Sequence, residues 1–120
     1  SDGGPQIELE VMAEHAPANV ANCFAAVLRE ALSNTMRHAC AQTVTVRCME
    51  HPSFYQLIVT DDGADGVQAS GRGATEGMGL ASMRERIEAL GGTFTAGPRA
   101  GSPGWRVFAT VPKQQGDDAR

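Results

Sequence analysis

Five segments of the chain alternate apolar and polar residues, which is the pattern of half-buried β-strands. We expect strands over residues 7–11, 43–49, 54–60, 93–96 and 105–111. The turn-forming residues His51-Pro52-Ser53 separate the second strand from the third, so these two strands should form an antiparallel hairpin. A turn with two prolines, residues 97–104, should precede the last strand, which Pro112 closes.

Two further segments have the period of an amphipathic α-helix. The first covers about residues 18–39, and the second begins near Leu80 and stops at Gly91-Gly92. Their apolar stripes are Val20, Phe24, Val27, Leu28 and Ala31, and Leu80, Met83, Ile87 and Leu90. Because helices do not alternate strictly with strands, a two-layer α/β sandwich fits better than a doubly wound parallel sheet.

The composition is that of one small globular domain. The 120 residues are 42% hydrophobic and 20% charged. We expect the domain to occupy residues 7–112, with a linker or expression remnant at 1–6 and a flexible polar tail at 113–120. A net charge of −4 argues against nucleic-acid binding, and no apolar run approaches the ~18 residues of a membrane span. The three cysteines lack CxxC spacing, so we interpret them as reduced thiols in the cytoplasm.

Glycine is more frequent in this chain than in an average protein, and its distribution is informative. The chain has 14 glycines, and six of them fall within positions 63–79. Such a stretch is not ordinary helix or strand. Long loops inside small domains are often functional, so this segment is expected to act as a lid over a site.

Four polar residues lie along one narrow face of the first predicted helix. Glu30, Asn34, Arg37 and His38 have spacings of i, i+4, i+7 and i+8. The carboxylate and the amide could provide oxygen ligands for Mg²⁺, while the arginine and the histidine could contact phosphate oxygens. The alternative is a solvated helix face with a Glu30–Arg37 pair.

Two motifs further along the chain favour the first interpretation. Asp61-Asp62-Gly63 ends a strand just before the glycine-rich loop, where a carboxylate can accept a hydrogen bond from an exocyclic amine. Glycine at that point lets a flat ring approach the backbone. Gly77-Met78-Gly79 opens the second helix, whose free N–H groups form a ready phosphate site.

Together these segments resemble the catalytic, ATP-binding domain of sensor histidine kinases. Residues 29–39 (REALSNTMRHA) resemble the N box, Asp61-Asp62-Gly63 the start of the first glycine box, and residues 77–86 (GMGLASMRER) the second. Together with Leu90-Gly91-Gly92, the last phrase is most like the nitrate-sensor and desaturase-sensor branch. The resemblance covers residues 7–112.

The resemblance implies the Bergerat fold, a two-layer α/β sandwich with a mixed, mostly antiparallel sheet, and ATP and Mg²⁺ as cofactors. It implies that Asn34 holds Mg²⁺ and that Glu30 is catalytic, acting through a metal-bound water. It further implies that Arg37 and His38 touch phosphates or ribose.

The same resemblance assigns the remaining site residues. Asp61 would accept from the adenine amino group, and Gly63 would let adenine sit close. Gly77 and Gly79, with Leu80 of the same box, would place backbone amides near the phosphates and hinge the lid.

The sequence departs from the family pattern at two places. Asp65 stands at the second glycine of the first glycine box, and Trp105 stands where many relatives carry a threonine. The phosphoacceptor histidine of such kinases lies in a separate dimerising helical hairpin, and none of His15, His38 and His51 has that context.

The partners implied are therefore that helical domain and, indirectly, a response regulator, in a cytoplasmic domain that could belong to a membrane-anchored sensor. Two alternatives remain at this point. One is an anti-sigma-factor serine kinase of the same fold, which the Met83-Arg84-Glu85-Arg86 phrase disfavours. The other is a degenerate binding domain, which the intact Glu30, Asn34 and Asp61 disfavour.

Overall fold

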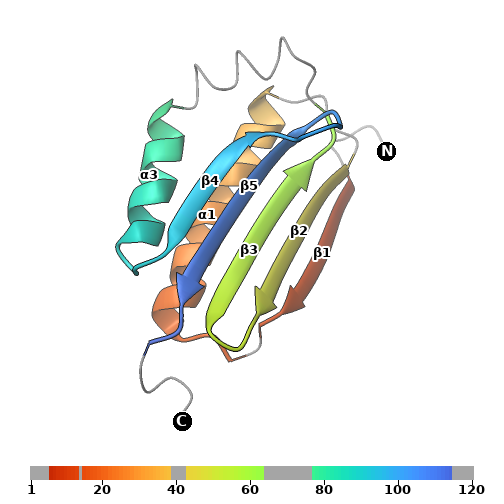
Figure 1. Cartoon of the computed structure of the whole chain (residues 1–120). Coiled ribbons are helices and arrows are strands. Elements are labelled where there is room, and N and C mark those ends of the chain that lie inside the picture. The colour runs from red at the N-terminus through yellow and green to blue at the C-terminus, as the bar shows by residue number, and fades with distance from the viewer. Residues whose placement is uncertain (1–5, 14, 39–42, 64–76, 115–120) are drawn as a thin grey trace.

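The computed structural model describes residues 6–13, 15–38, 43–63 and 77–114, which form one sheet and two helices (Figure 1). In chain order the elements are β1 (Gln6–Met12), α1 (Ala18–His38), β2 (Thr43–Glu50), β3 (Phe54–Asp61), α3 (Gly77–Glu88), β4 (Thr93–Pro98) and β5 (Trp105–Pro112). The glycine-rich lid predicted from the sequence lies mostly outside the described residues.

The sheet has the order β1-β2-β3-β5-β4. β1 pairs with β2 in parallel, and the other three pairs are antiparallel, including the predicted β2–β3 hairpin. Both helices lie on one face of this sheet (Figure 1). The predicted two-layer sandwich with a mixed, mostly antiparallel sheet is therefore confirmed.

The core fills the space between the two helices and the sheet. Alternate residues of β2, β3 and β5 are buried, as the period-two pattern predicted. The first helix contributes the stripe Val20, Phe24, Val27 and Ala31, and the second contributes Met83 and Ile87. Leu28 and Leu80 are half-buried at the border of this core.

Several element ends differ from the sequence-based expectation. β4 continues through Gly97 and Pro98, where a turn was expected, because these residues still pair with Arg106 and Trp105. Proline is tolerated there because β4 is an edge strand and needs no donor on its outer side. At the chain ends, Gln6 already belongs to β1, and the Lys113 N–H donates to Ser53 O at 2.9 Å.

The predicted stop of α3 at the glycine pair is confirmed. Gly91 has a φ of +78°, and the Gly92 N–H donates to Ile87 O at 3.0 Å, which closes the last turn. A Cβ on Gly92 would lie 2.0 Å from Thr110 O, so glycine also permits close contact with β5.

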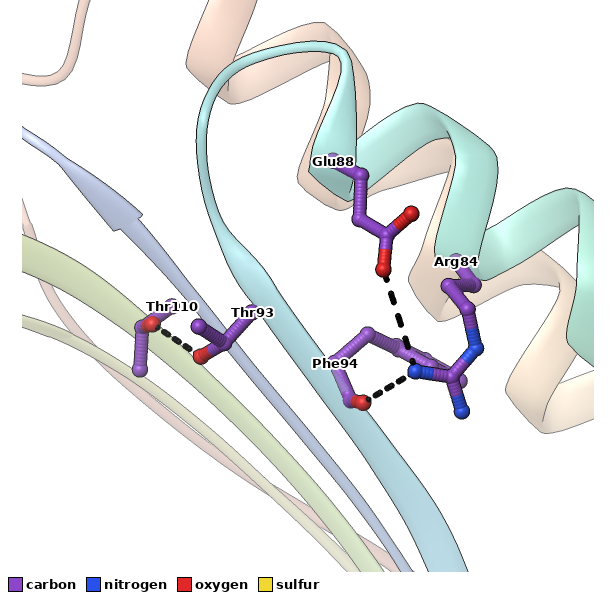
Figure 2. A network of polar contacts seen from close by, with 5 residues as sticks. All are labelled: Arg84, Glu88, Thr93, Phe94 and Thr110. Atoms are coloured by element: carbon purple, nitrogen blue, oxygen red, sulfur yellow. Dashed lines mark hydrogen bonds and ion pairs between the residues drawn. The ribbon is translucent and has the colours of Figure 1, made fainter.

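The exposed charged face of α3 is also tied to β4 (Figure 2). Arg84 donates to Phe94 O at 2.9 Å, lies 3.9 Å from the Glu88 carboxylate and stacks over the Phe94 ring at 5.3 Å. Beside it, the hydroxyls of Thr93 and Thr110 form a hydrogen bond between β4 and β5. The Arg84 contacts with Phe94 thus connect α3 to β4, and the threonine pair connects β4 to β5.

No helix within the described residues is both long enough and apolar enough to cross a membrane.

Two cysteines of the described chain, Cys23 and Cys48, are free thiols. Burial raises the pKa of Cys23, an effect that the nearby Arg86 charge partly offsets, and burial alone raises the pKa of Cys48. The pKa of each thiol is therefore higher in the folded chain than the ordinary value of 9.0 that applies when the chain is unfolded. Its contribution to the free energy of unfolding is complete below pH 9 and is lost as the pH rises from 9 through the pKa of the folded state.

The free energy of unfolding should therefore fall as the pH is raised above about 9. We expect urea titrations between pH 7 and 10 to show a smaller loss for the variant Cys23→Ala/Cys48→Ala than for the wild-type chain. An equal loss in both proteins would show that other groups dominate the alkaline transition.

Candidate functional site

The polar face of α1 meets the first turn of α3. A Cβ built on Gly79 would lie 2.6 Å from Glu30 Oε2 and 3.7 Å from Asn34 Nδ2. The backbone of Gly79 therefore lies against both side chains, and a larger residue there would have to displace the Glu30 carboxylate. The structure thus brings together the predicted polar helix face and the predicted second glycine box.

Asn34 points into the protein and not into solvent. Its exposed fraction is 5%, and it follows Val27 and Ala31 of the buried stripe at i+7 and i+3. Glu30, one turn earlier, is half-buried. The alternative of a fully solvated helix face is therefore wrong for Asn34.

Asp61 is a buried carboxylate at the end of β3, with an exposed fraction of 3%. Its Oδ2 accepts a hydrogen bond from Thr35 Oγ1 at 3.1 Å, and its Oδ1 accepts one from the Gly63 N–H, also at 3.1 Å. The two bonds hold the carboxylate in one orientation.

Thr35 is a site residue that the sequence analysis missed. It lies 26 positions before Asp61, and only the fold brings the two together. A signal did exist, because Thr35 continues the stripe Val27–Ala31 at i+4 and is itself buried. A buried polar residue on an apolar stripe needs a partner, and here that partner is Asp61.

The acid next to Asp61 has a different role. Asp62 is exposed, and its Oδ1 accepts from the Thr43 N–H at 3.1 Å, which ties the end of β3 to the start of β2. Of the two adjacent acids, Asp61 faces the helices and Asp62 supports the strand end.

The first residues of β5 pack against Asp61. Trp105 pairs with Asp61 across the β3–β5 ladder and is 8% exposed, so the residue at this position is part of the core. Gly104 has a φ of +122°, and a Cβ there would lie 1.9 Å from Asp61 O. The position of the carboxylate thus depends on a glycine 43 positions further along the chain.

The described residues therefore gather most of the predicted site at one end of the sheet. Three elements supply these residues: the C-terminal half of α1, the end of β3 and the start of α3. The residues are Glu30, Asn34, Asp61, Gly63, Gly77, Gly79 and Leu80. Arg37 and His38 lie in the last turn of α1, but their side chains are outside the described part of the structure, as is Asp65.

The donor set fits magnesium bound together with a polyphosphate. Within the described residues there is no group of three His, Cys, Asp or Glu side chains that could hold a metal alone. One carboxylate and one amide, Glu30 and Asn34, lie side by side against Gly79. Mg²⁺ typically takes one or two protein oxygens and completes its shell with water and substrate phosphates.

Comparison with protein families matches residues 20–115 to the model described as the histidine kinase-, DNA gyrase B- and HSP90-like ATPase. The chain is 35% identical over 88 residues to the signal transduction histidine-protein kinase/phosphatase UhpB of Salmonella typhimurium, covering 73% of this chain and 16% of that protein. It is 34% identical over 109 residues to the sensor histidine kinase YxjM of Bacillus subtilis, covering 87% of this chain and 25% of that protein.

A third relative is the sensor histidine kinase NarS of Mycobacterium tuberculosis, which is 45% identical over 61% of this chain and 18% of its own length. The chain thus spans a quarter or less of these relatives. Among solved structures, the histidine kinase domain of the Erythrobacter litoralis EL346 blue-light activated kinase superposes with a TM-score of 0.67 at 17% identity, over 97% of this chain and 55% of that one. The Acinetobacter baumannii kinase AdeS gives 0.66 at 17% identity, over 89% and 53%.

Proposed function

This chain belongs to the histidine kinase-, DNA gyrase B- and HSP90-like ATPase family, and from that premise we propose that it binds Mg²⁺–ATP and delivers the γ-phosphate to a histidine of a separate helical domain. The observation that carries the proposal is the buried, doubly hydrogen-bonded Asp61 at the same end of the sheet as the Glu30–Asn34–Gly79 contact. The named relatives are sensor histidine kinases, which favours this reading over a serine kinase.

Adenine is recognised by Asp61 in this proposal. The bonds from Thr35 Oγ1 and from the Gly63 N–H fix the orientation of this carboxylate. A fixed acceptor favours a base that donates an amino hydrogen, and burial strengthens the discrimination because an unpaired buried group is costly. Gly63 leaves room for the ring beside the backbone.

The phosphates lie between α1 and the first turn of α3. The N–H groups of that turn have no partner within the helix and favour an anion, and Gly77, Gly79 and Leu80 belong to it. Asn34 and Glu30 hold Mg²⁺, Glu30 through a water, and Arg37 and His38 contact phosphate or ribose oxygens. Bound Mg²⁺ neutralises charge on the phosphates.

Catalysis in this proposal consists of positioning and charge stabilisation, with the nucleophile supplied by the partner domain. The partner is the dimerisation and phosphoacceptor domain of the same kinase, and a response regulator receives the phosphate afterwards. We place this domain on the cytoplasmic side of its parent kinase.

Base selectivity tests the role of Asp61. In Asp61→Asn the side chain can keep both local bonds, because its oxygen can accept from the Gly63 N–H and its amino group can donate to Thr35 Oγ1. The fold should therefore survive, while ATP affinity falls by roughly 10- to 100-fold, the equivalent of one hydrogen bond to a charged group. Calorimetric competition between ATP and GTP should show a narrowed preference for ATP.

The matched control is Asp62→Asn, which changes an exposed acid one position away. Its ATP/GTP ratio should equal that of the wild-type chain. Equal binding of ATP and GTP by the wild-type chain would disprove the adenine role of Asp61.

The chain alone should bind ATP without labelling itself. His51 precedes β3, whose eight residues from Phe54 to Asp61 span about 23 Å, seven steps of ~3.3 Å each. His15 lies near Glu50, the last residue of β2, at that same distant end. In-line transfer needs an acceptor about 3–3.5 Å from the phosphorus, so neither ring can accept the γ-phosphate.

Incubation with γ-labelled ATP should therefore give no acid-labile phosphohistidine. Addition of the matching helical hairpin in trans should restore slow labelling of the hairpin. Robust labelling of the isolated chain would contradict the proposal that the acceptor histidine lies in a separate domain.

A further inference from the structure

A second cavity lies at the same end of the sheet as Asp61, beside the edge strand β4. It has a volume of about 460 Å³ and is formed by β4, the turn after it and the start of β5. Its lining residues are Thr95, Ala96, Gly97, Pro98, Arg99, Ala100 and Arg106. Arg106 is exposed and alternates with buried Trp105 and Val107, so its side chain lies on the sheet face opposite the helices.

Two guanidinium groups share this cavity without a carboxylate partner. Within the part of the chain that the structure describes, Arg47 pairs with Glu10 and Arg84 with Glu88, but neither Arg99 nor Arg106 forms an ion pair. Arg99 also borders a smaller hollow beside Asp61 and Asp62, again without an ion pair to either acid. In a chain of net charge −4, the two guanidinium groups bring two positive charges to one cavity.

Both arginines are held in place by contacts that leave their charge available. Arg99 Nη1 donates to Pro103 O at 3.1 Å, and the guanidinium of Arg106 stacks over the Phe108 ring at 5.4 Å. Neither contact neutralises the positive charge. Both contacts restrict the arginine side chains already in the free protein, so a ligand that binds there loses less free energy in ordering them.

The space between these side chains is open. A Cβ on Gly97, which pairs with Arg106 across the β4–β5 ladder, would meet no atom within 4 Å. The exposed Thr95 adds a hydroxyl on the same edge of β4. The volume falls in the range of small-molecule sites, ~300–1,000 Å³, and exceeds what a single inorganic anion needs.

We propose that this cavity binds a small organic dianion, a phosphomonoester or a dicarboxylate, between Arg99 and Arg106. Planar guanidinium forks match carboxylate and phosphate oxygens, and a dianion removes the repulsion between two like charges in one cavity. The proposal is independent of the nucleotide site, which lies on the helix-covered face.

The test is an NMR titration of the whole chain with glycerol phosphate and, separately, with succinate, using neutral glycerol as a blank. We expect saturable shifts of the Thr95 and Gly97 amides and of the Arg106 side-chain N–H with at least one dianion. Response to glycerol phosphate alone assigns a phosphomonoester, response to succinate alone assigns a dicarboxylate, and response to both assigns a general dianion site.

The variants Arg106→Gln and Arg99→Gln should each weaken binding at least tenfold. Arg106→Gln alters an exposed side chain and is expected to keep the fold, so it remains informative if Arg99→Gln is poorly folded. The matched control is Arg47→Gln, which removes an exposed arginine of β2 that already pairs with Glu10 of β1. Absence of saturable shifts, or equal binding by wild type and Arg106→Gln, would overturn the proposal.

Discussion

Replacing Gly104 by alanine is expected to destabilise the domain by on the order of 3–5 kcal/mol. Two effects act together at this position. The φ of +122° lies in a region that residues with a Cβ rarely adopt, and the new Cβ would lie 1.9 Å from Asp61 O and 2.9 Å from Arg99 Cδ. The Asp61 contact is with backbone of a central strand, so it cannot be relieved by a side-chain rotation. Urea unfolding measures the loss.

Two other glycines of the same region allow the effect of the positive φ and the effect of the close contact to be measured separately. Gly101 has a φ of +74° but no atom within 4 Å of its Cβ position, so Gly101→Ala should cost only about 1 kcal/mol of backbone strain. Gly97 has neither feature, and Gly97→Ala should be close to neutral. If Gly104→Ala were as stable as Gly97→Ala, the contact between β5 and the end of β3 would not be as tight as described.

Local patterns in the sequence predicted most of the fold. The strands of the β2–β3 hairpin and the last strand follow from alternation, and α3 ends where Gly91 and Gly92 provide its cap. Each of these features depends on residues a few positions apart, and such spacing is visible in a single sequence.

Features that depend on distant residues were not predictable in this way. Ile7, Leu9 and Val11 alternate like a half-buried strand, yet all three are exposed, because β1 is an edge strand that no described helix covers. The extension of β4 to Pro98 depends on its pairing with Trp105, which local turn signals concealed. In both cases the sheet order decides the outcome.

The candidate site likewise contains residues that the sequence predicts and contacts that it does not predict. Glu30 and Asn34 are one helical turn apart and Asp61 ends a strand, so the sequence could identify them as a group. The Thr35–Asp61 bond and the contact of Gly104 with Asp61 join residues 26 and 43 positions apart, and the fold alone shows them. The distant residues that hold a site residue in place are therefore harder to predict than the site residue itself.

Asn34→Ala is expected to have the largest effect on nucleotide binding. Asn34 is buried and its amide lies against Gly79, at the junction where we propose that Mg²⁺ and the phosphates bind. Loss of this ligand should weaken Mg²⁺–ATP binding by about 2–3 kcal/mol, or roughly 30- to 150-fold, and abolish phosphotransfer to the helical domain. Binding of ATP without Mg²⁺ should change much less, so calorimetry with and without the metal gives the decisive difference.

The matched control is Asn22→Ala, which removes an exposed asparagine three turns earlier on the same helix. That variant should keep both the affinity and its dependence on Mg²⁺. A stability measurement is needed beside it, because truncating a buried residue also leaves a small void in the core. If Asn34→Ala remains folded and responds to Mg²⁺ as the wild type does, Asn34 is not a metal ligand and the phosphate end of the site must be assigned to other residues.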